Sequence, residues 1–187
     1  NGGDGLYAGA ELAEQGEEVE TYLTAATAHE PALEAFRRAG GRVLDGLPDS
    51  PWEYALAIDA ITGIGGTAGL REELAEVVEF TEFPLTRVLS VDVPSGIDAD
   101  TGDGADLHIS ADATVTFGGW RRAHALNPAC GSQLLADINV GEQTLSGALA
   151  ELSEEALLGE TLLLYASRAV SPDAEWSLPL TYMQAAR

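Results

Sequence analysis

The segment from Val88 to Asp98 constrains the fold more strongly than any other part of the chain. It begins as an apolar, β-branched run of strand length and stops abruptly at a Pro-Ser-Gly turn. A continuous apolar run is typical of a strand covered on both faces, at the centre of a parallel sheet. Asp92 interrupts this run just before the turn, where a buried carboxylate is costly without partners. Because ligands in open α/β sheets bind outside the carboxyl ends of the strands, we favour a functional over a structural role for Asp92.

Predicted strands and helices alternate along most of the chain. The pattern predicts further strands at residues 19–24, 42–44, 54–58, 113–117 and 133–140, and helices at residues 6–15, 30–39 and 70–80. Such alternation is typical of an α/β fold with a mostly parallel sheet and helices on both faces. After Gln143 the pattern is mostly helical, and beyond Ser171-Pro172 it weakens toward a tail.

Polar residues stand at three predicted strand ends. Asp59 follows one strand, and Asp92 and Ser95 follow another. Asn1 and Asp4 stand in a glycine-rich turn at the start of the sequence, and we expect a further strand before Asn1. Because the carboxyl ends of parallel strands share one edge of a sheet, these side chains should lie along the same edge. Amide, carboxylate and hydroxyl oxygens suit a hard cation rather than zinc.

Two glycine-rich segments, residues 2–5 and 63–69, each precede a predicted helix. Glycine lets backbone N–H groups approach a ligand closely, and a helix N-terminus adds positive potential, so both segments suit phosphate groups. The first segment, taken alone, is better explained as an ordinary tight turn. Together with the carboxylates they predict a phosphorylated, nucleotide-like ligand beside a cation. Neither segment fits a P-loop or a complete Rossmann fingerprint, and Ser95 does not stand in a nucleophile elbow.

The charge of the chain excludes two classes of partner. It has 31 acidic residues against 9 basic ones, all of them arginines, and a net charge of −22. This balance argues against a nucleic-acid surface and against anionic membranes. No apolar run is long enough to cross a bilayer. The single cysteine, Cys130, cannot form an internal disulfide, so a cytoplasmic setting is the simplest interpretation.

Three blocks of sequence resemble the signature blocks of the NAD(P)H-hydrate epimerase family, the YjeF N-terminal domain. They are residues 1–5, 59–65 and 91–102, of which the long Pro-Ser-Gly block is the most specific. Residues 111–117 and 130–138 also follow the family pattern, so the resemblance covers about residues 1–141 in the right order. We therefore expect an epimerase-like domain, incomplete at its N-terminus, over residues 1–141. Residues 142–187 would be a helical extension, a tail or a linker toward an ADP-dependent dehydratase.

The resemblance implies a three-layer αβα Rossmann-like fold and a homodimer. It also implies the interconversion of the R and S epimers of hydrated NADH or NADPH, with a potassium ion near the nicotinamide site. Carried over position by position, the potassium ligands would be Asn1, Asp59 and Ser95. Asp92 is the candidate acid–base group. The residues expected to contact the substrate are Asn1, Gly2, Gly3, Asp4, Gly63, Ile64, Gly65, Gly66, Thr67, Ala68, Gly69 and Asp92.

The chain also departs from the family pattern. A lysine commonly follows the strand at residues 113–117, whereas this chain has Trp120-Arg121-Arg122. If that lysine matters, Arg121 or Arg122 must replace it, and the two kinds of cation are not equivalent. The missing lysine and the unexplained segment after residue 142 motivate an alternative, in which the same fold is a non-catalytic nucleotide-binding or scaffold module. The retention of Asp59, Asp92 and Ser95 together argues against that alternative.

Overall fold

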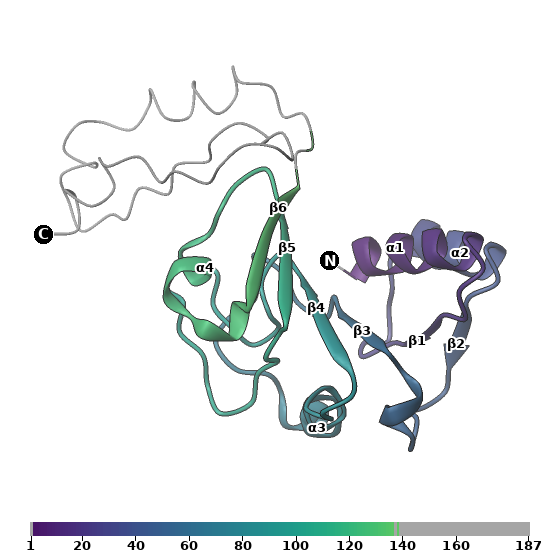
Figure 1. The fold of residues 1–187 in the computed structure, drawn as a ribbon, viewed down its shortest axis with the longest axis horizontal. Helices are drawn as coiled ribbons and strands as arrows, with labels where there is room; N and C mark the ends of the chain where they lie inside the picture. The colour runs from purple at the N-terminus through teal and green to yellow at the C-terminus, as the bar shows by residue number, and fades with distance from the viewer. Residues whose placement is uncertain (1, 137, 139–187) are drawn as a thin grey trace, which may run out of the picture.

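The computed structural model describes residues 2–136 and residue 138. Its strands form two sheets, and the strands within each sheet are parallel (Figure 1). A pair of short strands forms the first sheet, in the order β1 (Glu20–Tyr22) and β2 (Arg42–Leu44). Four strands form the second sheet, in the order β3 (Leu56–Asp59), β4 (Arg87–Val91), β5 (Ala113–Phe117) and β6 (Ser132–Ala136). Neighbouring strands of the second sheet are parallel throughout. The predicted α/β fold with a parallel sheet is therefore confirmed.

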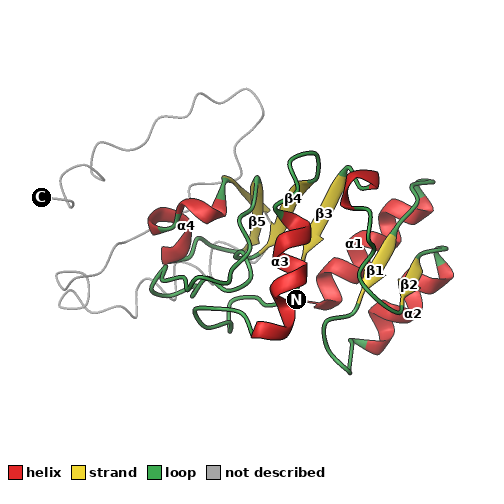
Figure 2. Cartoon of the chain, turned by 90° about the horizontal axis from the view of Figure 1, so that it is seen from below, coloured by secondary structure: helices red, strands yellow, loops and turns green. Residues whose placement is uncertain are grey.

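Helices cover both faces of the strands. Helices α1 (Gly2–Glu14) and α2 (Glu30–Arg38) lie on one side, and α3 (Ala75–Thr81) and α4 (Arg122–Leu126) lie on the other (Figures 1 and 2). This division follows from the handedness of parallel connections. In Figure 1 the pair β1 and β2 lies beside β3, so the strands are added toward one end of the row from β1 to β2 and toward the other end from β3 to β6. Right-handed crossovers then place the two sets of helices on opposite faces.

Each helical layer buries its own apolar cluster. Leu6 and Ala10 of α1 pack with Leu33 and Phe36 of α2, with Val43 at the edge of this cluster. On the other side of the sheet, a second cluster joins α3 to β4, and a third joins α4 to the Pro-Ser-Gly segment. The second contains Val78, Val88, Ile109 and Ala111, and the third contains Val93, Ile97, Ala99, Ala123, Ala129 and Cys130. The third cluster holds the end of β4 in place.

A large cavity lies beside the two sheets. It has a volume of about 1250 Å³ and is lined by parts of α1, β1 and β3, including Thr21, Ala57 and Ala60. Asp59, Asp92 and Ser95 are not among its lining residues. The predicted substrate residues Gly2, Gly3 and Asp4 do line it, so the cavity meets the predicted site at the first turn of α1, beside the carboxyl end of β3.

Two predicted helix starts were wrong. Residues 2–5 form the first turn of α1 rather than a loop before it. A Cβ atom on Gly5 would come within 2.6 Å of the Cβ of Ala60, so glycine here allows close packing of the helix. The helix predicted from Leu70 begins later, with a 3₁₀ turn at Glu72–Leu74 before α3. The amides of Gly69 and Leu70 bond to the carbonyls of Gly96 and Leu107, which keeps this segment out of the helix.

The other predicted elements differ from the structure mainly at their ends. The strand predicted at residues 54–58 begins at Leu56 and includes Asp59, and a 3₁₀ turn at Pro51–Glu53 precedes it. The predictions for Asn1, for residues 139 onward and for the helical extension at 142–187 lie outside the described residues. Within the part that is described, no helix has both the length and the hydropathy needed to cross a membrane.

Candidate active site

The Pro-Ser-Gly turn follows β4 and makes hydrogen bonds to the end of β3. Ile97 N–H bonds to Pro94 O at 3.0 Å, and Gly96 has φ +90°, which fits a type II turn with its required glycine. The turn directs Ser95 toward Asp59. Ser95 N–H donates to Asp59 Oδ2 at 2.8 Å, and Ser95 Oγ donates to Asp59 Oδ1 at 2.5 Å. The structure therefore brings together two of the three residues predicted to hold a cation.

Asp59 is a buried carboxyl group surrounded by neutral donors. Besides Ser95, it accepts hydrogen bonds from Ser90 Oγ at 2.8 Å and Ile61 N–H at 3.3 Å. Only 4% of Asp59 is exposed. Burial raises the pKa of Asp59 above its usual value, although the hydrogen bonds from Ser95, Ser90 and Ile61 act in the opposite direction. Because none of these donors carries a charge, a bound cation would offset the cost of the ionised form.

The oxygen atoms at Asp59 therefore suit a hard cation better than a transition metal. They belong to the carboxylate and to the hydroxyl group of Ser95, which also accepts from Thr62 N–H at 2.9 Å. Among the described residues, no three His, Cys, Asp or Glu side chains gather in a way that could hold a metal ion. Asn1, the third predicted ligand, lies outside that range.

Asp92 has a strained backbone at the end of β4. Its φ is +66°, and among the described residues it is the only one other than glycine with a positive φ. Val93 N–H bonds to Val91 O at 2.9 Å, so Asp92 is the central residue of a three-residue γ-turn. The γ-turn with positive φ is rare and strained, at a cost of about 1–3 kcal/mol. Such strain is concentrated at functional sites, and it supports a functional role for this half-buried residue.

The predicted substrate loop at residues 63–69 is attached to the Pro-Ser-Gly turn at both ends. Thr62 N–H bonds to Ser95 Oγ, and Gly69 N–H bonds to Gly96 O at 2.8 Å. Within the loop, Gly66 N–H bonds to Gly63 O at 2.7 Å. Gly65 is exposed, has no positive φ, and a Cβ atom there would meet nothing within 4 Å. The loop is thus held close to Ser95 while its tip stays open.

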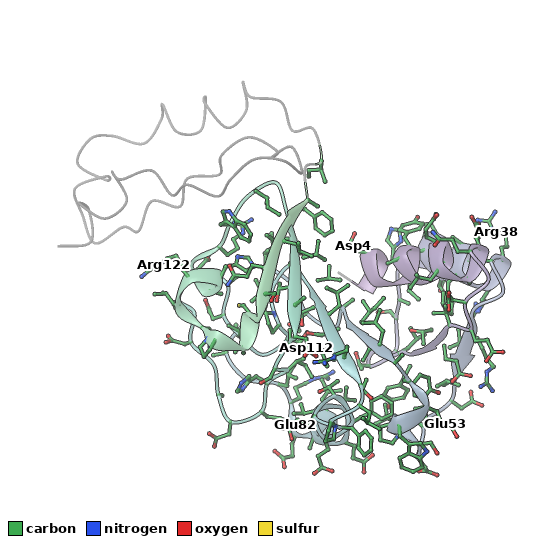
Figure 3. The ribbon with its side chains drawn as sticks, viewed as in Figure 1. Asp4, Arg38, Glu53, Glu82, Asp112 and Arg122 are labelled. Carbon is green, nitrogen blue, oxygen red and sulfur yellow. The ribbon has the colours of Figure 1, made fainter. Side chains whose placement is uncertain are left out.

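The first turn of α1 lies against the carboxyl end of β3. Gly5 packs on Ala60, the residue after Asp59, and a Cβ atom on Gly2 would lie 3.9 Å from Ala60 O. Asp4 is exposed in this turn and is labelled in Figure 3. The predicted substrate residues Gly2, Gly3 and Asp4 are therefore beside the end of β3, as expected, but in a helix.

Arg121 and Arg122 have different environments. Arg122 is exposed and points away from the body of the domain in Figure 3. Arg121 is half-buried, and its Nε is the one buried side-chain nitrogen or oxygen without a hydrogen-bond partner in the described part of the chain. Arg121 is therefore the better candidate for the position of the family lysine.

Sequence reasoning missed two residues that contact the predicted site. Ser90 bonds to Asp59, and its polar side chain inside the apolar run of β4 was a signal that could have revealed it. His124 lies 32 positions from Asp92, and its Nε2 is 2.7 Å from the carbonyl oxygen of Asp92. No local pattern marked this histidine.

Comparison with known proteins identifies the family. A model of the family described as YjeF-related protein N-terminus matches residues 1–123, which include all three signature blocks. The chain belongs to this family. It is 41% identical over 191 residues to the bifunctional NAD(P)H-hydrate repair enzyme Nnr of Corynebacterium glutamicum, covering 90% of this chain and 33% of that protein.

Two further relatives carry related names. The NAD(P)H-hydrate epimerase of Microbacterium testaceum is 43% identical over 124 residues, covering 63% of this chain and 48% of that protein. The bifunctional NAD(P)H-hydrate repair enzyme Nnr of Mycobacterium tuberculosis is 37% identical over 141 residues, covering 75% and 29%. The chain thus spans 29% to 48% of the length of these relatives.

Proposed function

We propose that this chain interconverts the R and S epimers of hydrated NADH and NADPH, and is therefore an isomerase of the metabolite-repair type. Family membership and the similarity to a named epimerase support the reaction class. The observation that carries the proposal is the pair of carboxyl groups at the carboxyl end of the sheet. Asp59 is buried and bonded to Ser95, and Asp92 lies in a strained turn on the adjacent strand.

Asp92 is the proposed acid–base residue. The reacting carbon of the hydrate carries both a hydroxyl group and the ring nitrogen. Its configuration is lost if the C–O bond breaks with loss of water and re-forms on the other face. It is also lost if the hydroxyl is deprotonated, the C–N bond opens to an aldehyde, and the ring closes again. Both routes need a group that donates a proton and takes it back within hydrogen-bond reach, and a half-buried carboxyl at a strand end suits that role.

The remaining residues would bind the substrate. We assign the diphosphate and nicotinamide contacts to the loop from Gly63 to Gly69 and to the first turn of α1, including Gly2, Gly3 and Asp4. Arg121 has a buried Nε without a partner, so it can supply the positive charge that the family lysine would otherwise provide. Asn1 belongs to the same proposed set.

A potassium ion would be held by Asp59, Ser95 and Asn1. When bound, it would offset the buried negative charge and fix the geometry of the site. Support comes from the neutral surroundings of Asp59, whose burial disfavours the ionised form without a cation. A homodimer in the cytoplasm is part of the same proposal, and sedimentation of the natural protein would test the dimer.

The direct test is epimerisation by the full-length protein in the presence of potassium. Purified R or S hydrate is supplied, and chromatography follows its conversion to the other epimer. We expect conversion in either direction, so that the reactions started from R and from S hydrate reach the same final ratio of the two epimers. A folded protein that binds the hydrate tightly without converting it would instead support a non-catalytic binding module, so binding is measured on the same sample.

A further inference from the structure

His124 connects the helix α4 to the strained backbone at Asp92. It is buried, with 5% of its surface exposed. Its Nδ1 accepts a hydrogen bond from Arg121 N–H at 2.8 Å, so the ring proton is assigned to Nε2. Nε2 therefore donates to Asp92 O at 2.7 Å. The hydrogen bond from His124 to the Asp92 backbone therefore comes from a side chain of α4.

The hydrogen bond from His124 holds the strained backbone of Asp92. Asp92 is a residue with a positive φ between two valines, and such a turn persists only when surrounding contacts determine it. Asp92 N–H bonds to Val115 O at 2.7 Å, and Val93 N–H bonds to Val91 O. His124 donates to the carbonyl of Asp92 and so adds a further hydrogen bond that holds this turn.

We propose that His124 is a positioning residue that fixes the Asp92 carboxyl by holding the carbonyl of the same residue in the γ-turn. The inference rests on the proposed acid–base role of Asp92. The same ring bonds to the amide of Arg121, so His124 also sets Arg121 relative to Asp92.

The surroundings of His124 favour its neutral form. Burial lowers the pKa of His124 below 6.5, and this is the largest cause, whereas its hydrogen bonds to Asp92 and Arg121 act in the opposite direction. The charged groups that face the ring are Arg121 and Asp92, and the indole of Trp120 packs against it edge-on. Protonation would place a hydrogen on Nδ1, opposite Arg121 N–H. The bond from Arg121 N–H therefore requires the neutral ring, whereas the bond to Asp92 O does not.

Two substitutions separate the two bonds of the ring. The amide nitrogen of Gln lies as far along the side chain as Nε2, so His124→Gln retains a donor for Asp92 O. The amide oxygen of Asn lies as far along as Nδ1, so His124→Asn retains the acceptor for Arg121 N–H but not the donor. His29→Asn is the matched control, because His29 caps α2 through its Nδ1 in a similar way.

The experiment measures kcat and KM for the hydrate with full-length wild type and the three variants, alongside thermal unfolding. We expect His124→Asn to lower kcat by about tenfold or more with little change in KM, and His124→Gln to stay within about threefold of wild type. His29→Asn should keep the wild-type kcat. Equal kcat for folded His124→Asn and wild type would overturn the proposal, because a purely structural histidine changes stability and not turnover. Equally low kcat in both His124 variants would also overturn it.

The pH profile supplies an independent readout. Protonation at Nδ1 keeps the Nε2 donor for Asp92 O and removes only the acceptor for Arg121 N–H, which is also what His124→Gln removes. As pH falls through the lowered pKa of His124, below 6.5, kcat of the wild type should therefore follow that of His124→Gln. A loss of kcat at acid pH in the wild type that is absent from His124→Gln would contradict the assignment. An inactive wild type would instead reject the proposed reaction, whereas an active wild type that tolerates His124→Asn rejects only the positioning role.

Discussion

The acidic residues at the two edges of the four-stranded sheet have different surroundings. At the amino edge, Asp112 accepts from Val88 N–H and from Arg87 Nη1, both at 2.8 Å, and it is exposed (Figure 3). At the carboxyl edge, Asp59 is buried among neutral donors and Asp92 lies in a strained turn. The carboxylate of Asp112 has a cationic partner and joins β4 to the segment before β5. At the carboxyl edge, the burial of Asp59 and the strained backbone of Asp92 both cost stability.

This difference distinguishes a structural carboxylate from candidate functional ones. Hydrogen bonds from the amide of Val88 and from the side chain of Arg87 lower the pKa of Asp112, whereas burial raises the pKa of Asp59. Burying a carboxyl group without an opposite charge and straining the backbone beside it both reduce stability. The carboxyl edge is therefore where we place the chemistry, and the predictions below test that contrast.

The largest effect is expected at Asp92. Asp92→Asn should lower kcat/KM by about 10²–10⁴-fold, because the amide cannot transfer a proton as the carboxyl does. Asn tolerates positive φ, so the fold should stay near wild type by circular dichroism and thermal unfolding. Retention of more than about a tenth of kcat/KM, a loss below about 1.4 kcal/mol, would exclude Asp92 as the acid–base group.

Substitution of Asp59 should change stability as well as function. Asp59→Asn replaces one acceptor oxygen by a donor that opposes the buried donors of Ser90 and Ser95. We expect a loss of about 2–4 kcal/mol in the free energy of unfolding, measured with urea. Asp112→Asn is the matched control on the opposite edge of the sheet. If Asp59→Asn and Asp112→Asn lose the same small amount of unfolding free energy, the proposed contrast between the two edges of the sheet is wrong.

Potassium should stabilise the wild type more than sodium or lithium at matched ionic strength. A cation at 100 times its Kd adds about 2.7 kcal/mol to the free energy of unfolding, which thermal unfolding would resolve. Asp59→Asn should lose this response because it lacks the negative charge that the cation offsets. Equal responses of the wild type to the three ions would indicate screening alone and would argue against the site.

Gly65→Val tests the loop with little cost to the fold. A side chain at Gly65 meets no neighbouring atom and no positive φ opposes it, so stability should stay near wild type. If the loop approaches the diphosphate, the β-branched side chain should weaken hydrate binding by about tenfold in Kd, measured by calorimetry. Gly46→Val is the control, since its position is also open. Wild-type affinity in Gly65→Val would place the phosphates elsewhere.

The smallest effect is expected at Asp112. Because its folded-state pKa lies below the usual 3.8, Asp112 contributes stability above that pH and loses it as pH falls through the lowered value. Asp112→Asn should therefore cost less than about 1 kcal/mol at pH 7, as for an exposed ion pair, and should flatten the acid dependence of stability. A stability difference between wild type and Asp112→Asn that grows as pH falls would contradict the sign.

Local patterns predicted much of the fold and part of the site. The strand at 113–117 agrees with β5, the strand at 42–44 agrees with β2, and the helix at 30–39 agrees with α2 to within one residue. The proximity of Asp59 and Ser95 was also expected, because parallel strands share a carboxyl edge, whereas their direct hydrogen bonds were not. The roles of Asp92, Asn1 and the glycine loop in catalysis or binding stay predictions.

The sequence by itself determined the apolar run of β4, its abrupt end at Pro94 and the polar residues beside that end, because periodicity and turn chemistry are local. Only the tertiary structure decided that residues 2–5 are helical and that His124 bonds to Asp92. It also decided the positive φ of Asp92, which no neighbouring residue type requires. These features depend on which atoms meet across the sheet. Such contacts join positions far apart in the chain, and residue spacing along the sequence carries no signal for them.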